Sequence, residues 1–524
     1  MTPTTSSDSP ADWSWRTNPW LIAASVVLAT FMEVLDTTVI MVALPHIAGS
    51  MSASMSESTW TLTSYLVANG IVVPMSAWLA MRFGRKRLIM SCTGLFVAGS
   101  MACGLAPNLA TLVIARLFQG AGGGAMVPVA QAILLEAFPP RQRGMAMALF
   151  GLVVVLAPII GPTLGGWLTD HYSWRWAFYI NLPVGLLSLF LMARYLEDPP
   201  WIRHARIQHF DRLGFGLLVI WVGALQLVLD KGEDEDWFAS PWITRLTLVA
   251  IAGLIAFVVQ ELRAQQPVVD LKVFSDRNFT FGTLTAAIFF GTMFSAATML
   301  PQFLQTLMGY TAELSGLAVS PRGLGVLCAS PLVGYLLTFV DARKLIPFGL
   351  AVFGVSNYLL SRLNLQIAMG NIVLATVIQG FGMGFLFAPL MTLTVGTLKT
   401  EQMGQATSLY NLVRNVAGSI GISISTTYLL RDMQRHQALL VSHLTPYDPA
   451  YQHSLRALEQ MLGRANPPGP HDQQAQALLY RLLLQQAAAI SYVDLYRWLA
   501  LAVVICLPST LFMRRVVGRR SPQH

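Results

Sequence analysis

The sequence predicts an all-α membrane protein with about fourteen transmembrane helices, arranged as two six-helix bundles plus two extra central helices. Three observations support this prediction. Of the 524 residues, 54% are hydrophobic and only 11% are charged, whereas about 25% of the residues of a soluble domain are charged. Apolar runs of about 20 residues, long enough to cross a bilayer, recur along the whole chain. A set of glycines in the first half also recurs at a constant offset in the second half.

The predicted spans follow a polar N-terminal segment, which lacks the short apolar core of a cleaved signal peptide. In order, they lie near residues 20–43, 60–80, 88–106, 111–135, 144–168, 176–196, 213–230, 242–261, 279–301, 314–339, 345–362, 370–396, 404–428 and 498–514. The resulting divisions are a cytoplasmic tail (1–19), an N-terminal bundle (20–200), a two-helix insertion with flanking loops (201–278), a C-terminal bundle (279–514) and a second cytoplasmic tail (515–524).

Charges in the loops predict the orientation of the chain. Loops after even-numbered spans are rich in Arg and Lys, as at 82–87, whereas the loop at 231–237 after an odd-numbered span is acidic. Cytoplasmic loops of membrane proteins carry the excess of Arg and Lys, so both termini are expected in the cytoplasm. The net charge of +8 then reflects topology, and no nucleic-acid partner is needed to explain it.

One polar loop, at 429–496, is much longer than the others and is expected outside the cytoplasm. Its helical-looking stretches are interrupted by ANPPGP at 465–470. Two interpretations remain open at this point. The loop is either an amphipathic cover on the membrane surface or a docking surface for a partner protein.

An internal repeat relates the two halves. RLFQGAGGGA at 116–125 echoes ATVIQGFGMGF at 375–385. At an offset of 260 positions, one glutamine and five glycines match: Gln119, Gly120, Gly122, Gly124, Gly144 and Gly161 fall on Gln379, Gly380, Gly382, Gly384, Gly404 and Gly421. Parallel halves of this kind are typical of the major facilitator architecture, in which the substrate site lies between the halves near the bilayer midplane.

Two carboxylates in the first span are the leading candidates for chemistry. Glu33 and Asp36 are spaced i, i+3 and therefore share one helical face. A charge at the centre of a membrane helix costs about 2.5–3.5 kcal/mol on insertion scales, so such groups usually face a cavity or a partner. We expect at least one of them to carry protons, with Asp36 before Glu33. The alternative is that one merely pairs with an arginine during assembly.

Three arginines also lie within predicted spans. Arg116 cannot lose its charge and is suited to pairing with a deprotonated Asp36, whereas Arg322 and Arg414 are expected along a polar path for the substrate. Asn411 and Asn415 share a helical face with Arg414. The amides Gln119 and Gln379 complete the candidate substrate path. The alternative for each arginine is a structural tie between helices.

The sequence indicates no metal site and no disulfide framework. The four cysteines lie within apolar spans without CxxC spacing, and the nine histidines are scattered along the chain. No phosphate-binding loop of the form GxxxxGK[ST] occurs, so we expect a proton gradient rather than ATP as the energy source. No cofactor is expected.

Seven collinear segments carry a more specific resemblance, to the EmrB/QacA subfamily of drug:proton antiporters in the major facilitator superfamily, and most closely to its EmrB-type branch. They are LDTTVIMVALP (35–45), RLFQGAGGGA (116–125), GPTLGG (161–166), SWRWAFYINLPVG (173–185), LVLDKGEDEDWF (227–238), PVVDLKVFSDRNF (267–279) and SLYNLVRNVAGSIG (408–421). The resemblance implies an acid at the position of Asp36. It also implies the antiporter motif at Gly161, Pro162, Gly165 and Gly166.

The antiporter motif has a physical interpretation of its own. Glycines without side chains let another helix pack closely, and Pro162 frees a backbone carbonyl that neighbouring helices must cover. We expect a tight seam that opens and reseals as the halves rock. Simple close packing without a role in antiport is the alternative.

A cytoplasmic loop motif matches the family only in part. The family pattern GxLADRxGRK aligns with AWLAMRFGRK at 77–86. Met81 therefore replaces the acid, and Ala77 replaces the first glycine. Arg82, Gly84, Arg85 and Lys86 match. The chain therefore lacks the acid on which a charge lock at this loop would be built.

The resemblance implies an inner-membrane exporter, not an enzyme, that exchanges protons for hydrophobic, drug-like compounds. It further implies a periplasmic membrane-fusion adaptor and an outer-membrane channel as partners in a tripartite pump. A proton-coupled importer or a metabolite exporter on the same fold is one alternative. A membrane scaffold that transports nothing is another.

Overall fold

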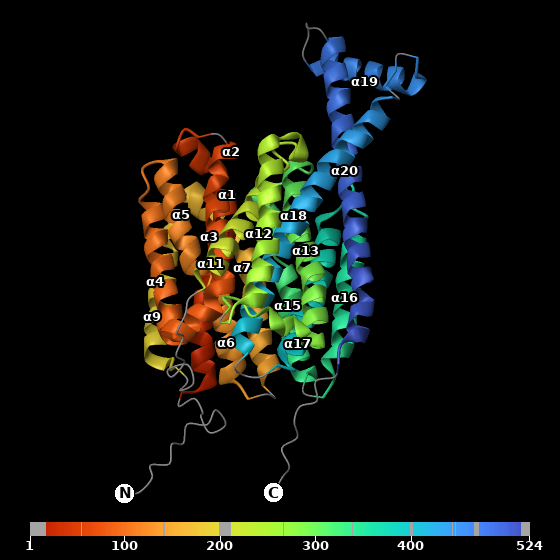
Figure 1. Ribbon diagram of the computed structural model, residues 1–524. Helices are drawn as coiled ribbons and strands as arrows, with labels where there is room; N and C mark the ends of the chain where they lie inside the picture. The colour runs from red at the N-terminus through yellow and green to blue at the C-terminus, as the bar shows by residue number, and fades with distance from the viewer. Residues whose placement is uncertain are drawn as a thin grey trace, which may run out of the picture.

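The computed structural model describes residues 17–53, 55–139, 142–198, 211–265, 267–337, 339–398, 402–442, 444–445, 447–465 and 471–514. The two predicted tails and the segment 466–470 fall almost entirely outside these described residues. Within them the chain forms helices and no strand. Described residues at both ends of the chain lie at the same end of the molecule (Figure 1), as an even number of crossings requires.

The N-terminal half is a bundle in which α1 packs against α7 and α9, and α5 lies between α3 and α4. Asn18 accepts a hydrogen bond from Trp20 and caps α1, which begins with a proline. The helices are α1 (Pro19–Ser50), α2 (Met55–Ser58), α3 (Trp60–Phe83), α4 (Arg85–Gly104), α5 (Leu109–Gly123), α6 (Met126–Ala137), α7 (Arg143–His171), α8 (Trp176–Tyr179) and α9 (Asn181–Tyr195).

The C-terminal half repeats this arrangement, with α17 between α15 and α16 and α13 against α18. Its helices are α13 (Arg277–Thr306), α14 (Ala312–Val319), α15 (Arg322–Leu336), α16 (Ala342–Leu360), α17 (Met369–Val395), α18 (Met403–Val441), α19 (Pro449–Ala465) and α20 (His471–Cys506). The insertion consists of α11 (Arg212–Lys231) and α12 (Pro241–Arg263). These two pack on each other, and α11 contacts both α3 and α18.

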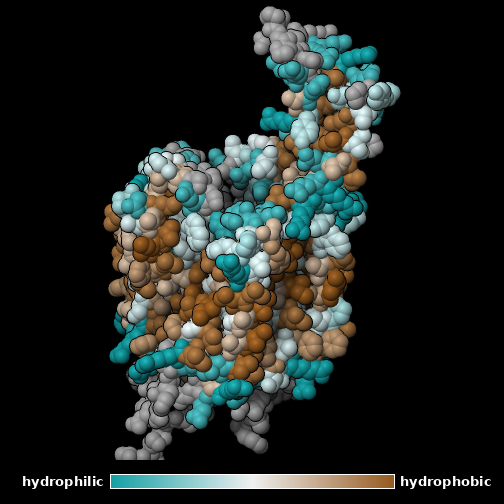
Figure 2. Space-filling model, turned by 45° about the horizontal axis from the view of Figure 1, so that its top comes forward, coloured by the Kyte–Doolittle hydropathy of each residue, from teal (hydrophilic) through white to brown (hydrophobic). Residues whose placement is uncertain are grey.

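A helix lies at each predicted span, although the number fourteen is not confirmed as such. Eleven stretches of the described chain are long and apolar enough to cross a membrane. The remaining three predicted spans coincide with α7, α16 and α18. Hydrophobic side chains form a band across the face of the bundle shown in Figure 2, between hydrophilic zones above and below it, as a bilayer requires.

The internal repeat has a physical basis in helix packing. A side chain at Gly122 of α5 would meet the backbone of Phe96 on α4, at 2.6 Å from its nitrogen. Its counterpart Gly382 of α17 meets the backbone of Phe353 on α16 in the same way, at 2.7 Å. Each half therefore needs glycine at this position because its central helix touches a neighbouring backbone.

The expected loop at 429–496 is largely helical. At 1.5 Å per residue, the 39 residues of α18 and the 36 of α20 extend about 58 Å and about 54 Å, well beyond the roughly 30 Å hydrocarbon core. Both helices continue past the bundle and, with α19, form a protrusion that stands off it (Figure 1) rather than a cover lying flat on the membrane. The last membrane helix therefore begins far earlier than residue 498.

Candidate functional site

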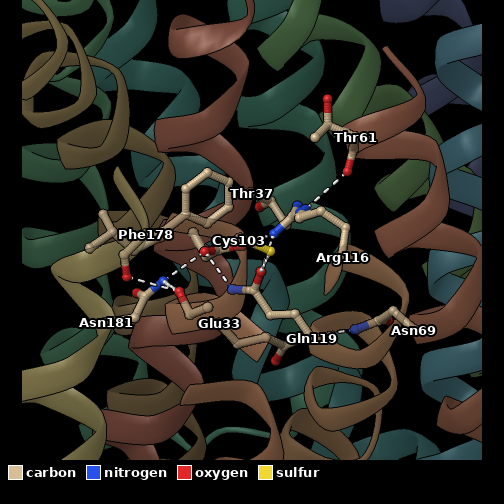
Figure 3. A network of polar contacts seen from close by, with 12 residues as sticks. Glu33, Thr37, Thr61, Asn69, Cys103, Arg116, Gln119, Phe178 and Asn181 are labelled. Atoms are coloured by element: carbon tan, nitrogen blue, oxygen red, sulfur yellow. Dashed lines mark hydrogen bonds and ion pairs between the residues drawn. The ribbon is translucent and has the colours of Figure 1, made fainter. Parts of the chain in front are cut away.

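Asp36 lies at the centre of a buried polar network in the N-terminal half. Its carboxylate accepts hydrogen bonds from Arg116 Nη1 (2.6 Å), Gln119 Nε2 (2.8 Å) and Asn181 Nδ2 (2.7 Å). These donors come from α5 and α9, so three helices meet at one carboxylate (Figure 3). Asp36 is 1% exposed, and its charge is stabilised entirely by these side chains.

Arg116 is completely buried and has several partners besides Asp36. Its Nε donates to the carbonyl of Thr61 (2.9 Å), and Nη1 also donates to Gln119 Oε1 (2.8 Å). The guanidinium lies 4.3 Å from the centre of the Tyr65 ring, a favourable cation–π arrangement. The guanidinium therefore keeps much of its stabilisation when the charge on Asp36 is removed.

Glu33 occupies a separate environment one turn earlier on α1. Its Oε1 accepts a hydrogen bond from Asn69 Nδ2 on α3 (2.9 Å), while Oε2 is buried without a hydrogen-bond partner among the described residues. Arg414, on α18 of the other half, interacts with Glu33 electrostatically. The two carboxylates thus differ in kind: Asp36 is fully paired within one half, whereas Glu33 faces the second half.

The glycines of the antiporter motif pack α7 against the segment of α1 that carries Asp36. A Cβ atom at Gly165 would lie 2.8 Å from the carbonyl oxygen of Val39 and 3.0 Å from its Cα, and one at Gly161 would collide with Thr38. Gly166 is half-buried, and the side chain of Pro162 is outside the described residues. The close helix packing expected of these glycines is therefore formed between α7 and α1, within the N-terminal half.

The C-terminal half lacks the charged pair at the corresponding positions. The offset of the repeat places Ala296 opposite Asp36 and Thr376 opposite Arg116. Gln379 and Arg322 are buried there instead. Both side-chain polar atoms of Gln379, and Nε and Nη2 of Arg322, have no hydrogen-bond partner among the described residues. Arg322 is therefore a buried cation for which the described residues provide no ion pair.

Polar contacts close the interface between the halves around a small cavity. Asn411 on α18 donates a hydrogen bond to Gln131 on α6 (2.5 Å), and the hydroxyls of Ser76 and Ser408 lie 2.6 Å apart. The cavity, about 10 Å³, is lined by apolar and aromatic side chains together with Gln131 and Arg414. Arg414 hydrogen-bonds Asn415 (3.4 Å). Of the candidate substrate-path residues, Asn411, Arg414 and Asn415 meet at this interface.

Other acids surround the cytoplasmic loop motif that lacks one at Met81. Arg85 forms a buried ion pair with Glu136 on α6. The backbone N–H of Lys86, at the start of α4, donates to Asp198 (2.8 Å), and Gly84 adopts φ +87° beside that carboxylate, a conformation that favours glycine. Arg82 is exposed. The acids that contact this loop, Glu136 and Asp198, therefore both come from outside the motif.

Three residues of the network were not identified from the sequence. Asn181 lies in the segment 173–185, which resembles the family but suggested no individual role. Asn69 and Tyr65 belong to an ordinary-looking span, and only the fold brings them to Glu33 and Arg116. Gln119, predicted to lie on the substrate path, donates a hydrogen bond directly to Asp36.

Comparison with known proteins identifies the family of the chain. The family model of the Major Facilitator Superfamily matches residues 26–422. The chain is 38% identical to the multidrug export protein EmrB of Haemophilus influenzae over 92% of both chains. It is also 35% identical to the fatty acid resistance protein FarB of Neisseria gonorrhoeae, over 93% of this chain and 94% of that protein.

Solved structures share the fold at low sequence identity. A double-tryptophan mutant of XylE superposes with a TM-score of 0.62 at 13% identity, over 96% of this chain and 97% of that one. The human organic anion transporter MFSD10 gives 0.58 at 12% identity, over 93% and 100%. Fold, family match and relatives agree that the chain is a multi-pass membrane transporter belonging to the major facilitator superfamily, with the EmrB-type proteins among its relatives.

Proposed function

We propose that this protein exports hydrophobic, drug-like compounds across the inner membrane in exchange for protons. The observation that carries the proposal is the Asp36–Arg116 ion pair (2.6 Å), which is completely buried at the centre of the polar network of the N-terminal half. A single buried carboxylate with a permanently charged partner suits a proton carrier because protonation removes the attraction between the two. The relatives named for multidrug export support the class of substrate.

The proton acts by changing which contacts α1 makes. With Asp36 charged, Arg116, Gln119 and Asn181 draw α1, α5 and α9 together. Protonation weakens the contact with Arg116, which retains the carbonyl of Thr61 and the amide of Gln119 as acceptors. Because α1 also packs on α7, a shift at Asp36 reaches the interface between the halves. A proton can drive this change only if the two states differ in their affinity for it.

The substrate is proposed to bind between the halves when the small central cavity opens. Its aromatic lining, including Phe290 and Tyr410, suits apolar compounds, and the side chains of Gln131 and Arg414 in the same lining suit polar substituents. Glu33 faces the same interface and favours cations. This mixture of apolar walls and a few polar groups fits a range of compounds rather than one.

Flux measurements in inverted membrane vesicles test the direction and the coupling. With an acidic interior, we expect a hydrophobic cationic dye to accumulate inside and protons to leave, and an uncoupler to abolish both. Vesicles that contain the Asp36→Asn variant are the control. Movement of dye and protons in the same direction would indicate an importer, and dye-independent proton flux would indicate a protein that does not transport such compounds.

We also propose that the protrusion lies outside the cytoplasm and docks a periplasmic adaptor that leads to an outer-membrane channel. Gln460, an exposed residue on α19, is a suitable position for labelling the protrusion. In a variant that lacks the native cysteines, Gln460→Cys should react with a membrane-impermeant thiol reagent added to intact spheroplasts. Reaction only after the membrane is permeabilised would contradict the orientation.

A further inference from the structure

A cluster of three metal-ligand side chains ties α18 to α20 at the base of the protrusion. Asp432 and His436 are spaced i, i+4 on α18, and Asp494 comes from α20. The Nε2 of His436 lies 3.3 Å from an oxygen of Asp432 and 3.3 Å from an oxygen of Asp494. None of these residues takes part in the network around Asp36, and none was identified from the sequence, because 58 positions separate His436 from Asp494.

The spacing of the three atoms suits a bound ion better than direct ion pairs. Hydrogen bonds between a charged nitrogen and a carboxylate are usually about 2.7–2.9 Å, shorter than both contacts of His436. In tetrahedral coordination, two ligands at about 2.0–2.1 Å from zinc lie about 3.3–3.4 Å from each other. The two separations that involve His436 are close to this edge length, and all three ligand atoms lie within 4.8 Å of one another. Asp432 is 7% exposed, and its Oδ2, which faces His436 Nε2 at 3.3 Å, accepts no hydrogen bond from the described residues.

Neighbouring contacts hold the three ligands in place. Arg497 donates to the other oxygen of Asp494 (2.8 Å), which orients that carboxylate as outer partners of metal ligands commonly do. On one side of the cluster, Trp498 donates to the hydroxyl of Tyr428 (3.0 Å). On the other, Gln437 donates to the hydroxyl of Tyr480 (2.7 Å). The cluster thus lies in a pair of helices whose register is fixed on both sides.

We propose that Asp432, His436 and Asp494 form a binding site for a divalent transition-metal ion, zinc by its geometry, that clamps α20 to α18. Two carboxylates balance the charge of the ion, and an imidazole ligand selects zinc-like ions over calcium and magnesium, which prefer oxygen. Three protein ligands leave a fourth position for water. The ion would stiffen the helix pair that carries the protrusion.

Cobalt titration of the full-length protein tests the site without any transport measurement. The protein is purified in detergent with a tag that contains no histidine and is stripped with a chelator. We expect one equivalent of Co²⁺ to bind with the visible absorption of tetrahedral coordination, and Zn²⁺ to displace it. His436→Gln and Asp494→Asn should each weaken binding at least tenfold, whereas His453→Gln, which changes an exposed histidine on α19, should leave it unchanged.

Several results would overturn the site. They are the absence of stoichiometric Co²⁺ binding by the native protein, equal binding by the His436→Gln variant, and competition by Ca²⁺ as effective as that by Zn²⁺. Absence of binding would leave a histidine shared between two carboxylates as the interpretation of the cluster. Gel filtration of each variant shows whether it is folded. Because the two variants lie on different helices, the site can still be tested if one of them fails to fold. The outcome does not depend on proton coupling at Asp36.

Discussion

Replacing Gly165 with leucine is expected to reduce transport at least tenfold while the protein still inserts into the membrane. Even the first carbon of a side chain at this position would lie 2.8 Å from the Val39 carbonyl oxygen and 3.0 Å from its Cα. Backbone atoms of a packed helix cannot move aside as a flexible side chain can, and overpacking of this kind typically costs about 1–3 kcal/mol. The leucine must therefore push α1 away from α7.

The displacement matters because Val39 lies one helical turn after Asp36. The three hydrogen bonds to the Asp36 carboxylate, all between 2.6 and 2.8 Å, depend on the position of α1 relative to α5 and α9. A shift of a few tenths of an ångström already weakens them. We therefore expect loss of coupling or a proton leak, in addition to a lower temperature of unfolding.

Gly94→Leu provides the matched control. Gly94 lies on α4 in the same half, and a Cβ atom there would meet nothing within 4 Å. The same side chain at Gly94 should leave dye efflux within about twofold of the native rate, since surface substitutions usually change stability by less than about 0.5 kcal/mol. Equal transport by the two variants, measured at equal amounts of protein in the membrane, would show that close packing at Gly165 is not required.

Hydrophobicity made most of the fold predictable from the sequence. Runs of apolar residues located a helix at every predicted span, because a chain in a bilayer must satisfy its backbone hydrogen bonds within helices. The protrusion was not predictable in the same way. Hydropathy falls after residue 428, so the last part of α18 resembles a loop, although the helix continues to Val441. Pairing with α20, far away in the sequence, stabilises these polar turns.

The candidate site was predictable where residue type alone carries the information. A carboxylate and an arginine within membrane spans require partners, and Asp36 and Arg116 are indeed paired. The amides Asn181 and Asn69 could not be distinguished from other polar residues, because their roles depend on which helices the fold places beside α1. The sequence likewise could not show that Gly161 and Gly165 of α7 pack on α1, because this also depends on which helices the fold places side by side.

Asp36→Asn is expected to abolish proton-coupled transport while the protein still binds its substrates. Asparagine has nearly the same shape as the protonated acid, and its oxygen still accepts hydrogen bonds from Asn181 or Gln119. Removing one partner of a buried ion pair costs about 3–5 kcal/mol when the other charge is left alone. Here Arg116 keeps the Thr61 carbonyl, the Gln119 amide and the Tyr65 ring, so a folded but less stable variant is expected.

The measurements are dye binding, and dye uptake into vesicles with and without a pH gradient. Binding should stay within a fewfold of the native affinity, and gradient-driven uptake should fall at least tenfold, which corresponds to about 1.4 kcal/mol. The residual transport should no longer respond to pH, because the neutral asparagine cannot release a proton at any pH. A temperature of unfolding measured in detergent distinguishes this result from simple misfolding.

Glu33→Gln is the matched variant, on the same face of α1 and one turn away. The glutamine oxygen can still accept the hydrogen bond from Asn69, but the negative charge near Arg414 is lost. We expect the pH gradient to drive transport of neutral compounds as before, and transport of cationic compounds to fall severalfold. Loss of coupling in Glu33→Gln with full coupling in Asp36→Asn would assign the proton to Glu33, the carboxylate that faces the second half. Coupling in both variants would exclude this pair of acids, and the proton carrier would then have to lie among other groups within the membrane.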